Sequence, residues 1–297
     1  MRIKRKKELI MNKYIIYTDS ACDIKPEMLE EWGVKSVALT FRFNGEDKEY
    51  GNNDMDISEF YGKMRSGAVA KTAAANSETF RLAFLEEVEK GNDVLYLGFS
   101  SGLSTTFNSA RIAAEAINAE HGAKVTVIDT LSASAGFGML VYLAKEKKNS
   151  GASLAEVAEY IKETIPHMCH WFTVDDLEYL KRGGRVSGVT AFVGNLLGIK
   201  PVLHMDNEGH LIKRDTVRGR KKSIIALADM YDKLAMTPDE GTVFICQADC
   251  SADADALAAL VKERHGVDVK LIVDTGTVIG AHSGPGTLAL FFIGKER

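Results

Sequence analysis

The stretch Leu97–Ala110, LGFSSGLSTTFNSA, decides how the first half of the sequence folds. The apolar run DVLYLGF (93–99) predicts a strand, and apolar residues at helical spacing predict a helix over 104–120. Six hydroxyl side chains crowd the junction between them: Ser100, Ser101, Ser104, Thr105, Thr106 and Ser109. One hydroxyl suffices as a helix cap. A strand end that meets a helix start presents free N–H groups and a favourable dipole to an anion. The hydroxyl side chains beyond the one needed as a cap therefore predict an anion-binding pocket.

The same alternation of strands and helices extends through the N-terminal half. Apolar runs predict strands over 13–19, 34–43, 93–99 and 124–130. Helices are predicted over 24–33, where Pro26 stands in the first turn, and over 77–89 and 104–120. Strands that alternate with helices predict a parallel sheet with crossover helices.

The pattern changes from about residue 170. The segments 199–205 and 210–217 flank a turn signal at 206–209 and predict a β-hairpin. Helices over 222–234 and 254–265 alternate with strands over 242–247 and 267–273, and 276–294 is predicted as a turn that leads into a last strand. We therefore expect two α/β domains, 13–168 with the parallel sheet and 169–297 with a mixed sheet and the hairpin. A ligand cleft lies between them in this prediction, and residues 1–12 form a disordered basic extension.

Composition narrows the class of protein. The 297 residues are 45% hydrophobic and 26% charged, as in ordinary globular proteins, and the net charge of −4 gives no reason to expect nucleic acid as a partner. No apolar run approaches the roughly 20 residues that span a bilayer, so we expect no stable membrane insertion.

The four cysteines point to a reducing compartment. They form no CxxC pair and no disulfide framework, which favours the cytoplasm. His167, Cys169 and His170 lie close in sequence, but no second group of ligands stands at a matching spacing. We expect this cluster to be a packed interior wall, and we expect no metal.

Two further segments carry candidate anion ligands. His282 lies in Ala281–Gly286, AHSGPG, whose glycines and proline predict a rigid turn with bare backbone. An imidazole there can donate to an anion, although the motif taken alone fits an exposed loop histidine better. Thr72 lies in a predicted loop over 69–73 and is weak support by itself.

The segment 181–222, called the basic segment below, carries ten Lys or Arg residues against three acidic ones, a local net charge of +7. Such asymmetry within an acidic chain predicts a docking surface for an acidic partner or for phosphates, with nucleic acid as the weaker alternative.

Six stretches in this order resemble the DegV family of bacterial fatty-acid-binding proteins. They are YTDSACDI (17–24), SSGLSTTFNSA (100–110), VIDTLSASAG (127–136), LEYLKRGGRVSG (177–188), LLGIKPVLHMDNEGHLIKRDTVRGRKKS (196–223) and HSGPGTLAL (282–290). The resemblance covers 13–293. The sequence departs from the family pattern at Ala73–Ala75, where the family has Ser-Gln-Pro, and at Thr105, where it has Gly.

The resemblance implies a binding protein with no catalytic residue and no cofactor. It implies that the carboxylate of a long-chain fatty acid is held by Thr72, by hydroxyls among Ser100, Ser101 and Ser104, and by His282. The protein would present this ligand to a separate fatty acid kinase, which forms an acyl-phosphate for phospholipid metabolism. Arg185 and Arg218 then look like contacts to that partner or to phosphate.

Two other classes of function remain open. One is a phosphotransferase related to the dihydroxyacetone kinases, although no Gly-Lys-Ser/Thr phosphate loop follows the serine-rich junction. The other is a regulatory protein-interaction module that uses the basic segment.

Overall fold

A computed structural model describes residues 13–187 and 198–297, so the predicted extension over 1–12 lies outside the described residues. The N-terminal part contains a four-stranded parallel sheet of order β2-β1-β6-β7. Its strands are β1 (Tyr14–Asp19), β2 (Val34–Val37), β6 (Asp93–Gly98) and β7 (Val125–Asp129). Helices α3 (Ser77–Glu89) and α4 (Thr106–His121) bury their apolar faces against one side of this sheet. The predicted parallel sheet is confirmed.

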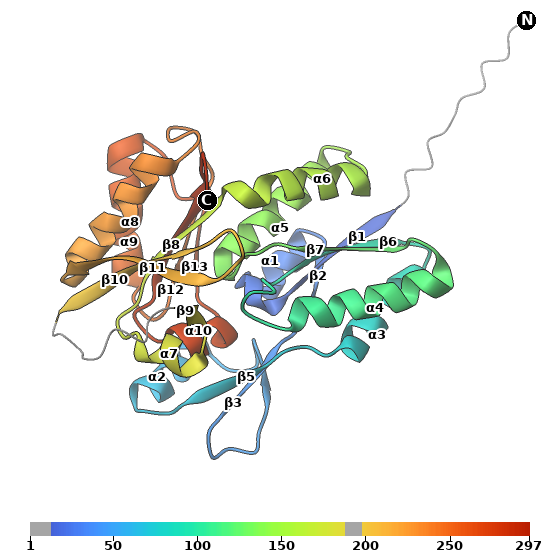
Figure 1. The fold of residues 1–297 in the computed structure, drawn as a ribbon, viewed down its shortest axis with the longest axis horizontal. Coiled ribbons are helices and arrows are strands. Elements are labelled where there is room, and N and C mark those ends of the chain that lie inside the picture. Colours follow the sequence, from blue (N-terminus) through green and yellow to red (C-terminus); the bar gives the residue numbers. More distant parts are fainter. Residues whose placement is uncertain (1–12, 188–197) are drawn as a thin grey trace, which may run out of the picture.

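The C-terminal part contains a seven-stranded mixed sheet of order β13-β12-β14-β8-β10-β11-β9. Its strands are β8 (Met168–Thr173), β9 (Val186–Ser187), β10 (Ile199–Met205), β11 (Leu211–Arg218), β12 (Val243–Gln247), β13 (Leu271–Asp274) and β14 (Leu288–Ile293). Strands β10 and β11 pair antiparallel, which confirms the predicted hairpin. Helices α8 (Arg220–Leu234) and α9 (Ser251–His265) cover one face of this sheet, at the opposite end of the molecule from α3 and α4 (Figure 1).

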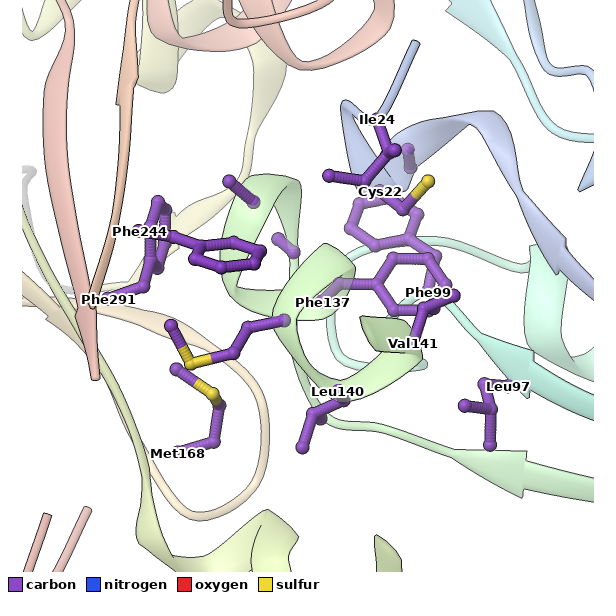
Figure 2. Close-up of a cluster of buried hydrophobic side chains, with 14 of the residues drawn as sticks. Cys22, Ile24, Leu97, Phe99, Phe137, Leu140, Val141, Met168, Phe244 and Phe291 are labelled. Carbon is purple, nitrogen blue, oxygen red and sulfur yellow. The ribbon is translucent and has the colours of Figure 1, made fainter. Parts of the chain in front are cut away.

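Helix α5 (Ser134–Asn149) lies between the two sheets and joins their cores. Figure 2 shows Phe137 and Val141 of this helix turned toward Phe99 of the parallel-sheet side, with Phe244 and Phe291 on its other flank. Two glycines allow this close packing, because a Cβ on Gly136 would lie 2.5 Å from His170 Nε2 and one on Gly138 would lie 2.7 Å from Cys22 O. One continuous core therefore spans both sheets.

Three further helices and two 3-10 turns precede or follow the strands described so far. Helix α1 (Pro26–Glu31) starts at the predicted proline, and α6 (Leu154–Thr164) packs beside α5. Helix α7 (Glu178–Gly183) leads into the described part of the basic segment, and the 3-10 turns are η1 (Ser20–Cys22) and η2 (Ile165–His167). Within the residues that the structure describes, no helix has the length and apolarity needed to cross a bilayer.

The predicted strand over 34–43 is wrong, because two strands in different sheets replace it. The chain leaves the parallel sheet after β2, and the backbone N–H of Leu39 donates to Ser20 Oγ (2.9 Å). It then enters β3 (Thr40–Phe43), which pairs antiparallel with β4 (Tyr50–Gly51) and β5 (Ala70–Ala73) in a third sheet. A side-chain hydrogen bond at Leu39 thus takes the place of continued strand pairing.

This three-stranded sheet and helix α2 (Ile57–Arg65) pack against C-terminal residues rather than against the parallel sheet. Phe41, Phe60 and Tyr61 share a cluster with Ala248 and Ala281. The segment that begins at β3 therefore contacts the C-terminal half of the chain. The division into 13–168 and 169–297 stays a prediction.

Two local predictions near the site are also wrong. The segment around Thr72 is strand β5 instead of a loop, since Thr72 pairs with Phe41. The segment around His282 is helix α10 (Thr277–Ser283) instead of a turn, and the bare-backbone turn begins only at Gly284, with φ of 79°. Burial of Val278 and Ala281 in the core supports a helix that its short sequence alone does not indicate.

Candidate functional site

A cavity of about 600 Å³ lies between the two sheets. Its walls come from the serine-rich junction and the start of α5 on one side, and from the mixed sheet, α7, α10 and β5 on the other. Its apolar lining includes Phe172, Met205, Leu211, Ile279, Ala289 and Phe291. The volume and the mainly apolar walls are typical of a small-molecule binding site.

Strand β14 shows how the sequence builds the cavity floor. Its run LALFFI is apolar throughout because both faces of the strand are buried. Ala289 and Phe291 face the cavity, while Leu288, Leu290 and Phe292 face α8 and α9. The two-residue period of a strand thus divides one apolar run between a binding surface and a structural core.

Thr72 and His282 meet at the cavity wall although they are 210 residues apart in the sequence. Thr72 Oγ1 on β5 lies 2.8 Å from His282 Nε2 on α10. On its other side the imidazole packs against Gly183, where a Cβ would clash with Nδ1. Burial, and to a lesser degree the charge of Arg185, lowers the pKa of His282 to about 4. The imidazole is therefore neutral near pH 7.

Ser101 and Ser104 line the same cavity from the serine-rich junction. Ser101 is exposed, and its backbone N–H donates to Asp129 Oδ1 (3.2 Å). Ser104 Oγ lies 2.9 Å from Thr106 Oγ1 and accepts from the N–H of Thr106 (3.2 Å), the first residue of α4. Helix α4 accordingly begins two residues later than predicted.

The structure does not bring Ser100 to the cavity. Ser100 is fully buried, and its hydroxyl donates to the carbonyl oxygen of Gly209 (2.8 Å). Four of the five predicted carboxylate ligands therefore line the cavity, and the hydroxyl of the fifth is bonded to the protein itself.

The two arginines lie in different places. Arg185 lines the cavity beside His282, where its Nε donates to Leu103 O (3.2 Å) and its Nη1 to Gly183 O. Arg218 is exposed at the end of β11 and is not among the cavity-lining residues. The structure therefore places Arg185 at the cavity and Arg218 outside it.

The sequence interpretation missed a second polar group, in which Ser134, Cys246 and Thr275 line the cavity and Asp23 is bonded to Ser134. Ser134 Oγ donates to Asp23 Oδ2 (2.5 Å), and Thr275 Oγ1 donates to Cys246 Sγ (3.3 Å). Burial of Asp23 raises the pKa of its carboxyl to about 7. Asp23 and Ser134 belong to two of the stretches that carry the family resemblance, YTDSACDI and VIDTLSASAG. Their place in these stretches is the signal by which the sequence could have identified them.

The residues considered as metal ligands bond to the backbone. His167 Nδ1 lies 3.1 Å from Gly294 O, His170 Nδ1 lies 3.1 Å from Met168 O, and Cys169 Sγ donates to Glu296 O (3.2 Å). Among the described residues, no three His, Cys, Asp or Glu side chains are grouped so as to hold a metal ion. The expectation of no metal stays a prediction.

Comparison with known proteins gives consistent matches over nearly the whole chain. A family model described as an uncharacterised protein of the DegV family matches residues 13–295. A DegV domain-containing protein of Clostridium perfringens is 40% identical over 291 residues, covering 97% of this chain and 99% of that one.

Solved structures agree with the family match. A DegV family protein from Thermus thermophilus, described by its fatty acid binding, has a TM-score of 0.86 at 32% identity and covers 95% of this chain and 99% of its own. DegV from Bacillus subtilis, described as a fatty acid binding protein, has a TM-score of 0.82 at 27% identity, with 96% and 100% covered. The fold, the family match and the sequence identity agree, and this chain belongs to the DegV family.

Proposed function

We propose that this protein binds a long-chain fatty acid, with its acyl chain in the cavity between the sheets and its carboxylate at Thr72, Ser101 and Ser104, beside His282, which orients Thr72. The observation that carries the proposal is an apolar cavity of about 600 Å³ whose polar groups include the Thr72–His282 pair. Solved relatives described as fatty acid binding proteins support it.

The tail supplies most of the binding free energy in this proposal. Each buried CH₂ contributes about 0.8 kcal/mol, so fourteen methylenes contribute roughly 11 kcal/mol before the ordering of the chain is subtracted. Phe172, Ala289 and Phe291 offer the apolar surface that this burial needs. Affinity therefore comes from the walls, and orientation must come from the polar groups.

The head group needs hydrogen-bond donors, because an unpaired buried carboxylate costs several kcal/mol. When the neutral His282 carries its proton on Nε2, it donates to Thr72 Oγ1 and leaves the threonine proton free for the ligand. A hydrogen bond to a charged acceptor contributes about 1.5–3 kcal/mol. Thr72 is thus oriented by His282 as a donor to the carboxylate.

We further propose that the chain acts as a carrier in the cytoplasm and presents the fatty acid to a separate fatty acid kinase for acyl-phosphate formation in phospholipid metabolism. In this role the partner performs the phosphoryl transfer. Arg185 beside the head-group site and Arg218, exposed at the end of β11, are the candidate contacts to the kinase or to phosphate.

Two measurements test the proposal. Mass spectrometry of an organic extract of the purified protein should detect a fatty acid, and the delipidated protein should take up palmitic acid saturably at one site. A pure interaction module would show no saturable uptake. A phosphotransferase acting alone would turn over a hydroxylated substrate with nucleotide in the absence of any partner, and that result would contradict the carrier proposal.

A further inference from the structure

A second cavity, of about 390 Å³, lies apart from the proposed fatty acid site. Helices α5 and α6 bound it on one side, and α8, the loop over 235–242 and β14 bound it on the other. Within the described residues, none lines both this second cavity and the cavity between the sheets. A volume of this size is sufficient for a small organic molecule, and the proposed function does not use it.

The second cavity has apolar surface that an occupant can cover. Met236 is 44% exposed, and Leu143 and Tyr160 are half-buried, so these three lining side chains are accessible from the cavity side. Covering them removes apolar area from water, which favours a ligand with an apolar portion.

Three side-chain donors of the wall are already bonded to backbone carbonyls. Thr164 Oγ1 donates to the carbonyl one turn earlier in α6 (2.7 Å), and the hydroxyl of Tyr231 donates to Pro238 O (2.9 Å). His167 Nδ1 lies 3.1 Å from Gly294 O. Because a carbonyl oxygen only accepts, Nδ1 carries the proton, and Nε2 of the neutral ring is an acceptor. These groups therefore leave acceptor capacity for a ligand.

Two carboxylates line the second cavity, one from each side. Glu163 stands in the last turn of α6, where the partial negative charge of the helix end also favours a cation. Glu240 belongs to a turn in which its N–H donates to Thr237 O (3.2 Å). Within 13–187 and 198–297, neither carboxylate has an ion-pair partner, since Lys147 Nζ lies over the ring of Tyr160 instead, 5.2 Å from its centre.

We propose that the second cavity binds a small organic cation, an aliphatic amine whose ammonium groups pair with Glu163 and Glu240. An ammonium offers only donors, which matches a wall of acceptors, and the carbon chain of the amine covers Met236, Leu143 and Tyr160. A fatty acid carboxylate fits this wall poorly, because it offers only acceptors. This site is additional to the proposed function and does not depend on it.

Calorimetric titration of the full chain at low salt tests the proposal with two probes, cadaverine and the uncharged pentanediol of the same chain length. Wild type should bind cadaverine at one saturable site and bind the diol at least about fivefold more weakly. The double variant Glu163→Gln, Glu240→Gln should weaken cadaverine binding about fivefold to twentyfold, as loss of two exposed ion pairs does. The control Glu89→Gln, Glu263→Gln removes two exposed charges outside the second cavity and should stay within about twofold of wild type.

Melting temperatures and palmitic acid binding separate this site from the proposed fatty acid site. Cadaverine should raise the melting temperature of the wild type and of the control, and raise that of Glu163→Gln, Glu240→Gln less. Palmitic acid binding should be the same in all three proteins, because the two cavities share no described lining residue. No saturable cadaverine binding, equal affinity for the diamine and the diol, or equal losses in both double variants would overturn the proposal. Failure to take up palmitic acid would overturn the proposed function alone.

Discussion

The hydroxyl of Ser100 donates a 2.8 Å hydrogen bond to the carbonyl oxygen of Gly209 and so ties the serine-rich junction of the parallel sheet to the β10–β11 hairpin of the mixed sheet. The two segments are in close contact, since a Cβ on Gly102 would lie 2.8 Å from Gly209 O. Met205 and Leu211, at the base of the hairpin turn, line the cavity. This bond therefore holds two walls of the cavity together.

Ser100→Ala should destabilise the protein without changing its preference for a free acid. Loss of the donor leaves the buried carbonyl of Gly209 unsatisfied, which costs about 1–3 kcal/mol in the free energy of unfolding measured with urea. The control Ser101→Ala removes an exposed hydroxyl and should stay within about 0.5 kcal/mol of the wild type. If Ser100→Ala kept full stability and lost selectivity for palmitic acid over its methyl ester, Ser100 would be a ligand of the carboxylate.

His282→Ala should weaken palmitic acid binding by roughly tenfold, because Thr72 loses the group that orients its hydroxyl. The fold should persist, as checked by far-UV circular dichroism, and acyl-phosphate formation with the cognate kinase should fall. His121→Ala, on the exposed end of α4, is the matched control. Undiminished acyl-phosphate formation by His282→Ala would show that the histidine has no part in holding the head group.

Ala289→Phe should exclude long acyl chains from the cavity. Ala289 faces the cavity from near the start of β14, so a phenyl ring there occupies space that the tail needs. Over-packing also costs about 1–3 kcal/mol of stability, which the melting temperature would report. A titration series from octanoic to stearic acid should show the largest loss for the longest chains. Ala123→Phe on the surface controls for the added ring, and equal losses at every chain length would contradict a tail site at Ala289.

Asp23→Asn should stabilise the protein increasingly as the pH rises. The pKa of Asp23 is about 7 in the folded protein, above its usual 3.8, because burial disfavours the charged form. Below pH 3.8 Asp23 is protonated in both the folded and the unfolded chain, and the protein keeps its full stability. As the pH rises toward and through 7 this stability is lost, because the unfolded chain releases the proton first. Urea unfolding at pH 5 and pH 8 should show the advantage of Asp23→Asn growing with pH. A constant or shrinking difference would mean that Asp23 ionises normally.

Arg218→Ala should reduce acyl-phosphate formation with the kinase and leave palmitic acid affinity within about twofold. Arg218 is exposed and does not line the cavity, so its charge is available to a partner and not to the bound head group. Lys262→Ala, an exposed cation on α9, controls for the loss of a positive charge. Equal losses of binding and of kinase use would make Arg218 a ligand-binding or structural residue.

Periodicity and turn signals predicted much of the architecture. The helix over 77–89 is α3 with the same bounds, and the parallel sheet and the 199–217 hairpin are confirmed. The errors lie where a distant contact overrides the local pattern. The apolar run 34–43 is divided by the bond from Leu39 N to Ser20 Oγ, and the segment around His282 becomes helical because it is buried against β3, β5 and α7.

The sequence by itself determined that hydroxyls gather where a strand meets a helix and that the segment 276–294 leads into a strand, because these properties depend on residues adjacent in the chain. Only the tertiary structure decided which of these hydroxyl residues line the cavity. Ser100 and Ser101 are neighbours, yet the Ser100 hydroxyl is bonded to Gly209 O, whereas Ser101 lines the cavity. Likewise, Thr72 and His282 become partners only when β5 packs beside α10. A side chain's direction is set by what packs against it, and that information is distributed over residues far apart in the chain.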